Sequence, residues 1–299
     1  MATQVLEPPI GAPELTSQET TRQWNRSSIL QLLREEADLI LARAADPAYD
    51  KPIYGLDNLR WYLDLSKDWG VVTLAELFQQ SPGKLLDVGA YYGLIGGAAI
   101  RAGWQVSAVD QCPMPSFSGL AAESRGVDKA VCNVCVDTLP YDTSSFDAIL
   151  CNEVLEHLVY APHLFFREIR RVLRPGGRLY LTTPNPAALS KLIRLARGKN
   201  NEPHFETFWR EDDAYEYKGR TFFKSMRETR LWTIDEMKQA LSEFGLKVAD
   251  YYYYGNTTTD GQLLTTSRRI RFTVNRWIRP AVKRNRLLGG GTIVIATKA

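Results

Sequence analysis

The sequence predicts an α/β fold built around a mostly parallel sheet with helices on both faces. Two observations carry this prediction: apolar segments of strand length recur from Leu85 onward, and helical patterns separate them. Strands that alternate with helices pair in parallel, because each crossover helix returns the chain to the same end of the sheet. The expected strands are 85–89, 105–109, 129–134, 146–151, 178–183, 246–254 and 292–297, and the expected helices are 94–102, 116–125, 162–174 and 233–244.

The first strand is followed by a turn whose residues indicate a ligand site. Gly89 and Gly93 let the backbone turn tightly and approach a ligand closely. Asp110 ends the second strand 21 residues after Gly89, near the spacing expected of an acid that binds ribose hydroxyls. The segment therefore predicts binding of an adenosine-containing cofactor.

The glycine spacing distinguishes between two cofactor classes. A nicotinamide fingerprint is Gly-x-Gly-x-x-Gly, whereas here Tyr91 stands in the place of the middle glycine. Asp87, two residues before Gly89, would repel a pyrophosphate but suits a ligand with an ammonium group and no phosphate. These residues favour S-adenosylmethionine and disfavour a nicotinamide-dependent oxidoreductase.

Composition limits the remaining classes. A chain of 299 residues with 44% hydrophobic residues can build a large core, and its net charge of +3 indicates no particular partner. The first residues lack the features of a signal peptide, and no apolar run approaches the roughly 20 residues that span a bilayer. A cytoplasmic protein with reduced cysteines is expected, and the lone Cys132-x-x-Cys135 pair predicts no metal site.

Two regions are expected along the chain. Residues 1–80 comprise a polar, poorly ordered start and an N-terminal helical arm, with helices beginning near Ser27 and Ser28, at 56–69 and at 73–80. Residues 81–299 form the α/β domain. Within it the aromatic insert 186–230 is expected to be a lid over an acceptor, or alternatively a small satellite core.

A basic segment lies near the end of the chain. Eight Lys and Arg residues fall between Arg268 and Arg286, and an apolar stripe recurs at helical spacing, which predicts a basic helix at about 262–286. Such a helix could make peripheral contact with an anionic membrane through residues 268–286, or bind a phosphate-bearing or lipid-linked substrate. The alternative is a helix docked on the sheet with a solvated cationic face. No nucleic acid partner is expected, since no binding module accompanies the charge.

Several segments in order resemble one family. They are Leu85-Leu86-Asp87-Val88-Gly89, Asp137-Thr138-Leu139-Pro140, Ser145-Phe146-Asp147, Glu153-Val154-Leu155-Glu156-His157, Arg174-Pro175-Gly176-Gly177 and Thr182-Thr183-Pro184-Asn185. The series looks like a class I S-adenosylmethionine-dependent methyltransferase, similar to quinone-biosynthesis and sugar methyltransferases. The resemblance implies a Rossmann-like, seven-stranded sheet with an antiparallel last strand, the cofactor S-adenosyl-L-methionine, and a small-molecule or sugar acceptor.

The resemblance also implies roles for individual residues. Asp87 would hold the ammonium group of the cofactor, and Asp110 both ribose hydroxyls. Cys135 stands where the family often has an acid, which puts an adenine contact there in doubt. The cofactor residues implied are Asp87, Gly89, Ala90, Tyr91, Gly93, Asp110, Gln111, Cys135, Val136, Cys151 and Asn152.

Methyl transfer to a hydroxyl requires a general base, because a neutral alcohol is a poor nucleophile. The candidates are Glu153, His157 beyond the fourth strand, and His204 in the insert. Both histidines have a structural alternative, as a residue bonded to nearby backbone or as a loop residue. Glu228 replaces a histidine that the family often carries, so no catalytic histidine is expected there. O-methylation of a small molecule is the expected reaction, and the alternative is a non-catalytic S-adenosylmethionine-binding scaffold.

Overall fold

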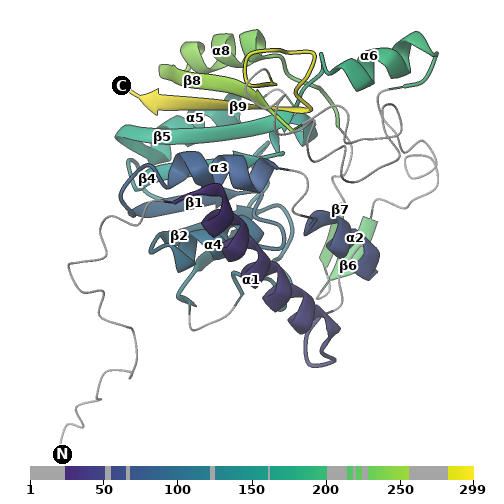
Figure 1. The fold of residues 1–299 in the computed structure, drawn as a ribbon. Coiled ribbons are helices and arrows are strands. Elements are labelled where there is room, and N and C mark those ends of the chain that lie inside the picture. The colour runs from purple at the N-terminus through teal and green to yellow at the C-terminus, as the bar shows by residue number, and fades with distance from the viewer. Residues whose placement is uncertain are drawn as a thin grey trace, which may run out of the picture.

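The described residues form one seven-stranded sheet with helices on both faces (Figure 1). The computed structural model describes residues 24–50, 55–64, 68–121, 125–160, 162–200, 214–217, 220–223, 228–255 and 282–299. In spatial order the strands are β3 (Asp128–Val131), β2 (Gln105–Asp110), β1 (Lys84–Val88), β4 (Phe146–Asn152), β5 (Leu173–Pro184), β9 (Gly291–Lys298) and β8 (Leu246–Tyr254). The first five pair in parallel, and β9 runs antiparallel to β5 and β8. The predicted sheet, including its antiparallel last strand, is confirmed.

Alternate residues of each strand face two separate apolar cores. Leu85 packs with α1 (Arg26–Ala45), α3 (Trp69–Leu77) and α4 (Leu94–Arg101) on one face of the sheet. Leu86 packs on the other face, with α5 (His163–Val172) and α8 (Ile234–Glu243). Because both faces are covered, the inner strands are apolar at nearly every position, as is typical of parallel sheets.

The N-terminal arm packs into the same core as the sheet. α1 begins at Arg26, capped by the side chain of Asn25, which accepts from the Ser28 N–H while Ser28 Oγ accepts from the Asn25 N–H. This capping box places the helix start slightly earlier than predicted. Ile29 and Leu33 are fully buried against the sheet side. A shorter helix, α2 (Gly55–Tyr62), lies near the carboxyl ends of the central strands (Figure 1).

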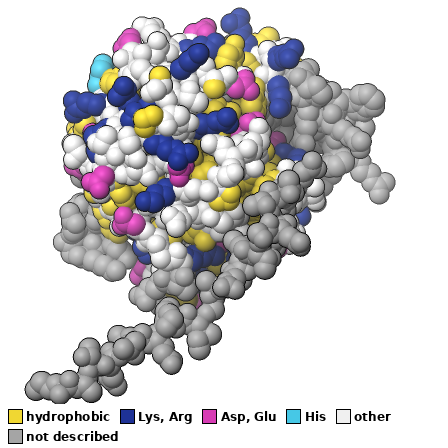
Figure 2. All heavy atoms as spheres, turned by 90° about the vertical axis from the view of Figure 1, so that its left-hand side faces the viewer, with side chains coloured by type: hydrophobic (Ala, Val, Ile, Leu, Met, Phe, Trp, Pro, Cys, Tyr) yellow, Lys and Arg dark blue, Asp and Glu magenta, His cyan; other side chains and the backbone are white. Residues whose placement is uncertain are grey.

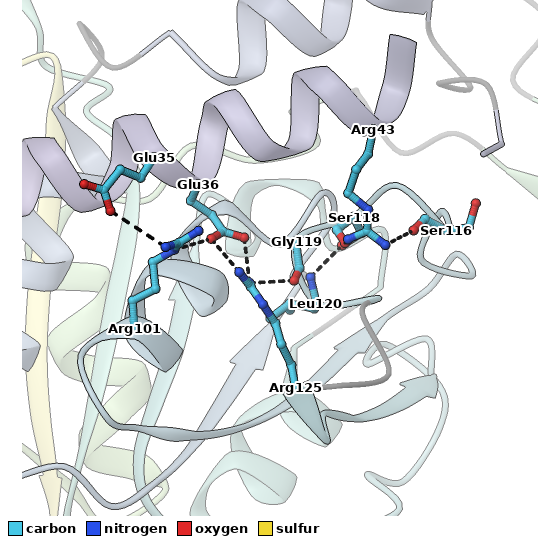
Figure 3. Close-up of polar contacts among 9 residues, drawn as sticks. All are labelled: Glu35, Glu36, Arg43, Arg101, Ser116, Ser118, Gly119, Leu120 and Arg125. Carbon is cyan, nitrogen blue, oxygen red and sulfur yellow. Dashed lines mark hydrogen bonds and ion pairs between the residues drawn. The ribbon is translucent and has the colours of Figure 1, made fainter. Parts of the chain in front are cut away.

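A buried ionic network joins α1 to the core (Figure 3). The carboxylate of Glu36 is fully buried and accepts hydrogen bonds from Arg101, at 2.8 Å, and from Arg125, at 2.7 and 3.0 Å. Arg43 donates to the carbonyl oxygens of Ser116 and Ser118, at 2.9 and 3.1 Å. The arm is thus bonded to the loop that follows β2.

The helix predicted at 116–125 is wrong over its described part, because residues 116–121 form turns. Two physical reasons are visible. Their carbonyl groups bond to Arg43 rather than along a helix. A side chain on Gly119 would also lie 2.2 Å from Glu36 Oε1, so the packing against α1 requires glycine, a poor helix former, at this position.

The insert and the basic segment are described only in part. The insert contains α6 (Leu189–Ala196) and an antiparallel pair, β6 (Ala214–Tyr217) and β7 (Arg220–Phe223). Most of the predicted basic helix lies outside the described residues, and 283–288 form turns, so the helix does not reach 286. None of the helices in the described part of the chain is long and apolar enough to cross a bilayer.

The face at the amino ends of the parallel strands has a mixed surface. Figure 2 shows Lys and Arg side chains interspersed there with acidic, apolar and other groups. The predicted site residues lie at the opposite edge, where the parallel strands end.

Candidate active site

The ends of three parallel strands bring the predicted residues to one level of the sheet. In the strand register Val88 pairs with Val109 on one side and with Cys151 on the other. The next residue of each strand is therefore at the same edge: Gly89, Asp110 and Asn152. This is the carboxyl edge, where parallel α/β sheets bind ligands.

The turn after β1 needs its glycines. Gly89 and Gly93 have φ of 70° and 74°, and a side chain on Gly89 would meet Val154 Cγ2 at 2.3 Å. Tyr91 also has a positive φ, 47°, which is uncommon for a residue with a side chain. Tyr91 stands where the nicotinamide fingerprint has its middle glycine, and its backbone adopts the left-handed conformation that glycine favours. Ala90 is buried between these residues.

Asp110 is held by backbone donors and keeps acceptor capacity. Its Oδ2 accepts from the Tyr91 N–H and its Oδ1 from the Cys112 N–H, both at 3.0 Å, and the Gln111 N–H also bonds to it. Burial raises the pKa of Asp110, and these hydrogen bonds oppose the rise. A carboxylate offers about four acceptor positions. The arrangement therefore fits a ligand with hydroxyl donors.

Asp87, the fourth residue of β1, is almost fully buried. Burial raises its pKa from 3.8 to about 7, a hydrogen bond from the Gly96 N–H opposes this, and the nearby Asp110 adds to it. An ammonium group placed beside Asp87 would favour the charged carboxylate and lower that pKa again.

Three tyrosines cover the turn from the side of α2. The Tyr62 ring packs edge-on against Tyr91 and Tyr92, with centroids 4.9 and 5.4 Å apart. The Tyr91 hydroxyl is 3.2 Å from Asn58 Oδ1 on α2. Burial raises the pKa of Tyr62 well above 10, and the negative charges of Asp87 and Asp110 raise it further. The Tyr62 hydroxyl therefore lies near both carboxyl groups. Sequence reasoning missed Tyr62, which stands out only as an aromatic residue in the helical arm.

Asn152 is joined to the arm through Thr73 of α3. Its Oδ1 accepts from Thr73 Oγ1 at 2.6 Å and from Thr182 Oγ1 at 3.3 Å. Within the described part of the chain its Nδ2 is buried and makes no hydrogen bond. An unsatisfied buried donor at this edge is suited to a ligand acceptor. Cys151 precedes it and is fully buried, and burial raises the pKa of its thiol well above 9.

Cys135 and Val136 lie in a turn after β3. The Cys135 N–H donates to Asn133 Oδ1 at 3.0 Å, and the Asn133 N–H donates to Asp137 Oδ2 at 2.8 Å. Cys135 is half-buried, whereas Val136 is 56% exposed. Since β3 neighbours β2, this turn lies on the Asp110 side of the site.

Two acids follow β4, of which Glu156 is buried and Glu153 is half-buried. Glu153 has φ of 52° and accepts from the Tyr254 hydroxyl at 2.8 Å, and Glu156 accepts from Thr183 Oγ1 at 3.0 Å. Burial raises the pKa of both acids, and the Tyr254 hydrogen bond opposes the rise at Glu153. The charge of Glu153 raises the pKa of Glu156 further, so the pair holds a proton above the ordinary range of either acid.

Of the two predicted histidines, the structure describes only His157. His157 is half-buried, with its Nε2 3.9 Å from Glu156 Oε1, so it belongs to the same cluster as Glu153. Glu228 is near this cluster as well and pairs with Lys191 of α6 at 3.5 Å. His204 lies outside the described residues. Sequence reasoning missed Thr73 and Tyr254, which come from elements distant along the chain.

The comparisons with known proteins cover part of the chain. Residues 86–181 match the family described as a methyltransferase domain. Over 116 residues the chain is 40% identical to the ubiquinone biosynthesis O-methyltransferase of Xanthomonas oryzae pv. oryzae, and the match covers 37% of this chain and 47% of that protein. The corresponding protein of Xanthomonas campestris pv. campestris (strain B100) is 40% identical over 115 residues, with the same coverage. The chain thus spans about half the length of these relatives.

A solved structure from Thermotoga maritima shares the fold. It is described as a methyltransferase dependent on S-adenosylmethionine and a possible histamine N-methyltransferase. It is 17% identical, has a TM-score of 0.50, and the match covers 81% of this chain and 95% of that one. These findings show that residues 86–181 form a methyltransferase domain of the kind that uses S-adenosylmethionine as its cofactor.

Proposed function

We propose that the protein is an enzyme that transfers a methyl group from S-adenosylmethionine to a hydroxyl group of a small-molecule acceptor. One observation carries the proposal. Asp110, a carboxylate with spare acceptor capacity, ends β2, and Glu153, a half-buried acid of raised pKa, follows β4. These strands flank β1, so both acids lie at the same edge of the sheet.

The chain's own residues suit the cofactor. Asp110 would accept from the ribose hydroxyls, and Asp87 would pair with the ammonium group. Gly89, Ala90 and Gly93 would bring the backbone of the turn close to the ligand. Gln111, Cys135 and Val136 would lie on the adenine side, and Tyr91, Cys151 and Asn152 would complete the site. When bound, the cofactor supplies a methyl group activated by its sulfonium and leaves as a neutral thioether.

We infer that Glu153 is the general base. A carboxyl group of ordinary pKa is too weak a base to accept a hydroxyl proton efficiently near neutral pH, and burial raises the pKa of Glu153. The Tyr254 hydroxyl, at 2.8 Å, orients this carboxylate and limits the rise. In the reaction Glu153 takes the hydroxyl proton while the acceptor oxygen attacks the methyl carbon. His157 is the second candidate base, and His204 remains a candidate from the insert.

The acceptor that we propose is a small molecule with a hydroxyl group. The names of the Xanthomonas relatives favour a hydroxyl acceptor over an amine. A sugar, a phosphate-bearing compound or a lipid-linked compound would each suit the basic surroundings of the insert. We propose residues 186–230 as the lid over this acceptor. Membrane contact through 268–286 and a cytoplasmic location stay predictions.

The experiment has two stages, so that cofactor binding and catalysis are read separately. Titration calorimetry measures S-adenosylhomocysteine binding to the wild type and to Glu153→Gln. Release of S-adenosylhomocysteine is then followed with a panel of phenolic, sugar and amine acceptors. We expect turnover on a hydroxyl acceptor that falls about 100-fold or more in Glu153→Gln with binding retained. Binding without turnover on any acceptor would favour the scaffold alternative, and turnover on amines alone would contradict O-methylation.

A further inference from the structure

Helix α6 exposes its apolar side to solvent. Leu189, Leu192 and Leu195 are 41%, 40% and 51% exposed, and none of the eight residues of the helix is buried. A surface helix of a globular protein normally buries its apolar stripe against the core. In α6 this orientation is reversed.

Two cationic side chains of α6 bond to neighbouring residues. Lys191 pairs with Glu228 beside the acid cluster, and only 17% of its side chain is exposed. Arg194 donates to the carbonyl oxygen of Asn200 at 3.0 Å. At 100° per residue Arg194 lies on the side of the helix opposite the leucines, whereas Lys191 lies at the edge of the leucine stripe, beside Leu195. These two polar contacts hold the helix with its leucines outward.

The surface beside α6 is basic. The Leu189 N–H donates to the Leu287 carbonyl at 2.9 Å, which brings the turn 283–288 next to the helix. Leu287 is 38% exposed. The exposed cations of the two segments are Arg197, Lys199, Lys283, Arg284 and Arg286. Neither 184–201 nor 282–299 contains an acidic residue.

We propose that α6 and the turn 283–288 dock on the surface of an anionic lipid bilayer. The outward leucines can enter the apolar region just below the headgroups, and the neighbouring cations can bind the negatively charged headgroups. No acidic residue in the two segments opposes this attraction. Against a protein partner, an apolar patch would not need this uniform positive charge. Figure 1 places α6 on the side where the parallel strands end, so docking would turn the active-site edge toward the membrane. The opposite face, seen in Figure 2, mixes both charges.

Vesicle sedimentation tests the proposal without cofactor or acceptor, so its outcome is independent of the proposed methyl transfer. The full chain is mixed with vesicles of phosphatidylcholine alone or with phosphatidylglycerol added. We expect binding to the anionic vesicles that weakens with salt. Leu195→Glu should lower the partition coefficient at least about tenfold, because the apolar surface that leucine would transfer from water to the bilayer is lost. Arg197→Gln and Lys199→Gln should each lower it roughly fivefold.

A matched control separates this patch from general surface effects. Val131 on the edge strand β3 is 49% exposed, close to the value for Leu195, so Val131→Glu should bind vesicles like the wild type. Equal binding by wild type and Leu195→Glu, or no binding to anionic vesicles, would overturn the proposal. So would a wild-type dimer in light scattering that Leu195→Glu dissociates without any vesicle binding, since this result would assign the patch to a second copy of the chain.

Discussion

The backbone N–H of Tyr91 donates to the carboxylate of Asp110, with 3.0 Å between N and Oδ2. This bond joins the turn after β1 to the end of β2, so the conformation of the glycine turn and the orientation of the carboxylate depend on each other. Asp110 is therefore oriented before any ligand arrives, which lowers the entropic cost of binding.

Replacing Asp110 should weaken cofactor binding strongly. Hydrogen bonds to a charged group contribute about 1.5–3 kcal/mol, so Asp110→Ala should raise the Kd for S-adenosylhomocysteine roughly 10- to 100-fold. Titration calorimetry measures this, and circular dichroism checks the fold. Asp128→Ala, at an exposed position of β3, is the control and should bind normally. Unchanged affinity in Asp110→Ala would remove this residue from the cofactor site.

Asp87 should make the ligand-free protein less stable as the pH rises. Its pKa is about 7 in the folded protein and 3.8 ordinarily, so between these values the folded state binds more protons than the unfolded one. The favourable contribution present below about pH 4 is lost as the pH rises through 7. Asp87→Asn should accordingly be more stable than the wild type at pH 8, by up to about 4 kcal/mol, with the difference disappearing near pH 4. Urea unfolding at several pH values checks this.

The same residue should give cofactor binding the opposite pH dependence. An ammonium group favours the ionised carboxylate, so affinity for S-adenosylhomocysteine should increase up to about pH 7 and then level off. In Asp87→Asn the affinity should be low and nearly independent of pH over this range. A wild-type affinity that is flat between pH 5 and 8 would contradict the role of Asp87.

The strands and the glycine turn were predictable because their signals are local. Leu85 to Gly93 carries its own strand, turn and helix start, and the spacing from Gly89 to Asp110 indicated the ribose-binding acid. Glu153 became a candidate because transfer to a hydroxyl requires a general base. Thr73 and Tyr254 could not be predicted, since their bonds to Asn152 and Glu153 join residues 79 and 101 positions apart. The helix expected at 116–125 failed for the same reason: the carbonyl groups of that loop bond to an arginine of the distant α1.

Tyr91 and Asn58 should be energetically coupled. Tyr91→Phe removes the hydrogen bond between α2 and the turn, whose heavy atoms are 3.2 Å apart, while the ring contacts with Tyr62 and Tyr92 stay. We expect Tyr91→Phe and Asn58→Ala each to lower the free energy of unfolding by about 1 kcal/mol. The double variant should lose less than the sum, by roughly 0.5 kcal/mol or more, in a double-mutant cycle. Strict additivity would show that the contact contributes nothing to stability.

Glu36 should matter far more than its neighbour Glu35, although both contact Arg101 (Figure 3). Glu36 is fully buried between Arg101 and Arg125, so Glu36→Gln removes the buried charge that both guanidinium groups bond to and should cost about 3–5 kcal/mol. The Glu35 side chain is 44% exposed and lies 3.7 Å from Arg101, so Glu35→Gln should change stability by less than about 1 kcal/mol. Equal losses in denaturant unfolding would contradict the assigned burial.

Tyr254 should set the pH at which the proposed base becomes active. Its hydroxyl bonds to Glu153 and lowers the pKa of that acid, against the larger effect of burial. In Tyr254→Phe this bond is lost, so the pKa of Glu153 should rise and the acid limb of the kcat/KM profile should move to higher pH. Activity at high pH should recover, because the ionised carboxylate is still present. A structural role for Tyr254 would lower activity at every pH alike, and an unmoved acid limb would point to His157 as the base instead.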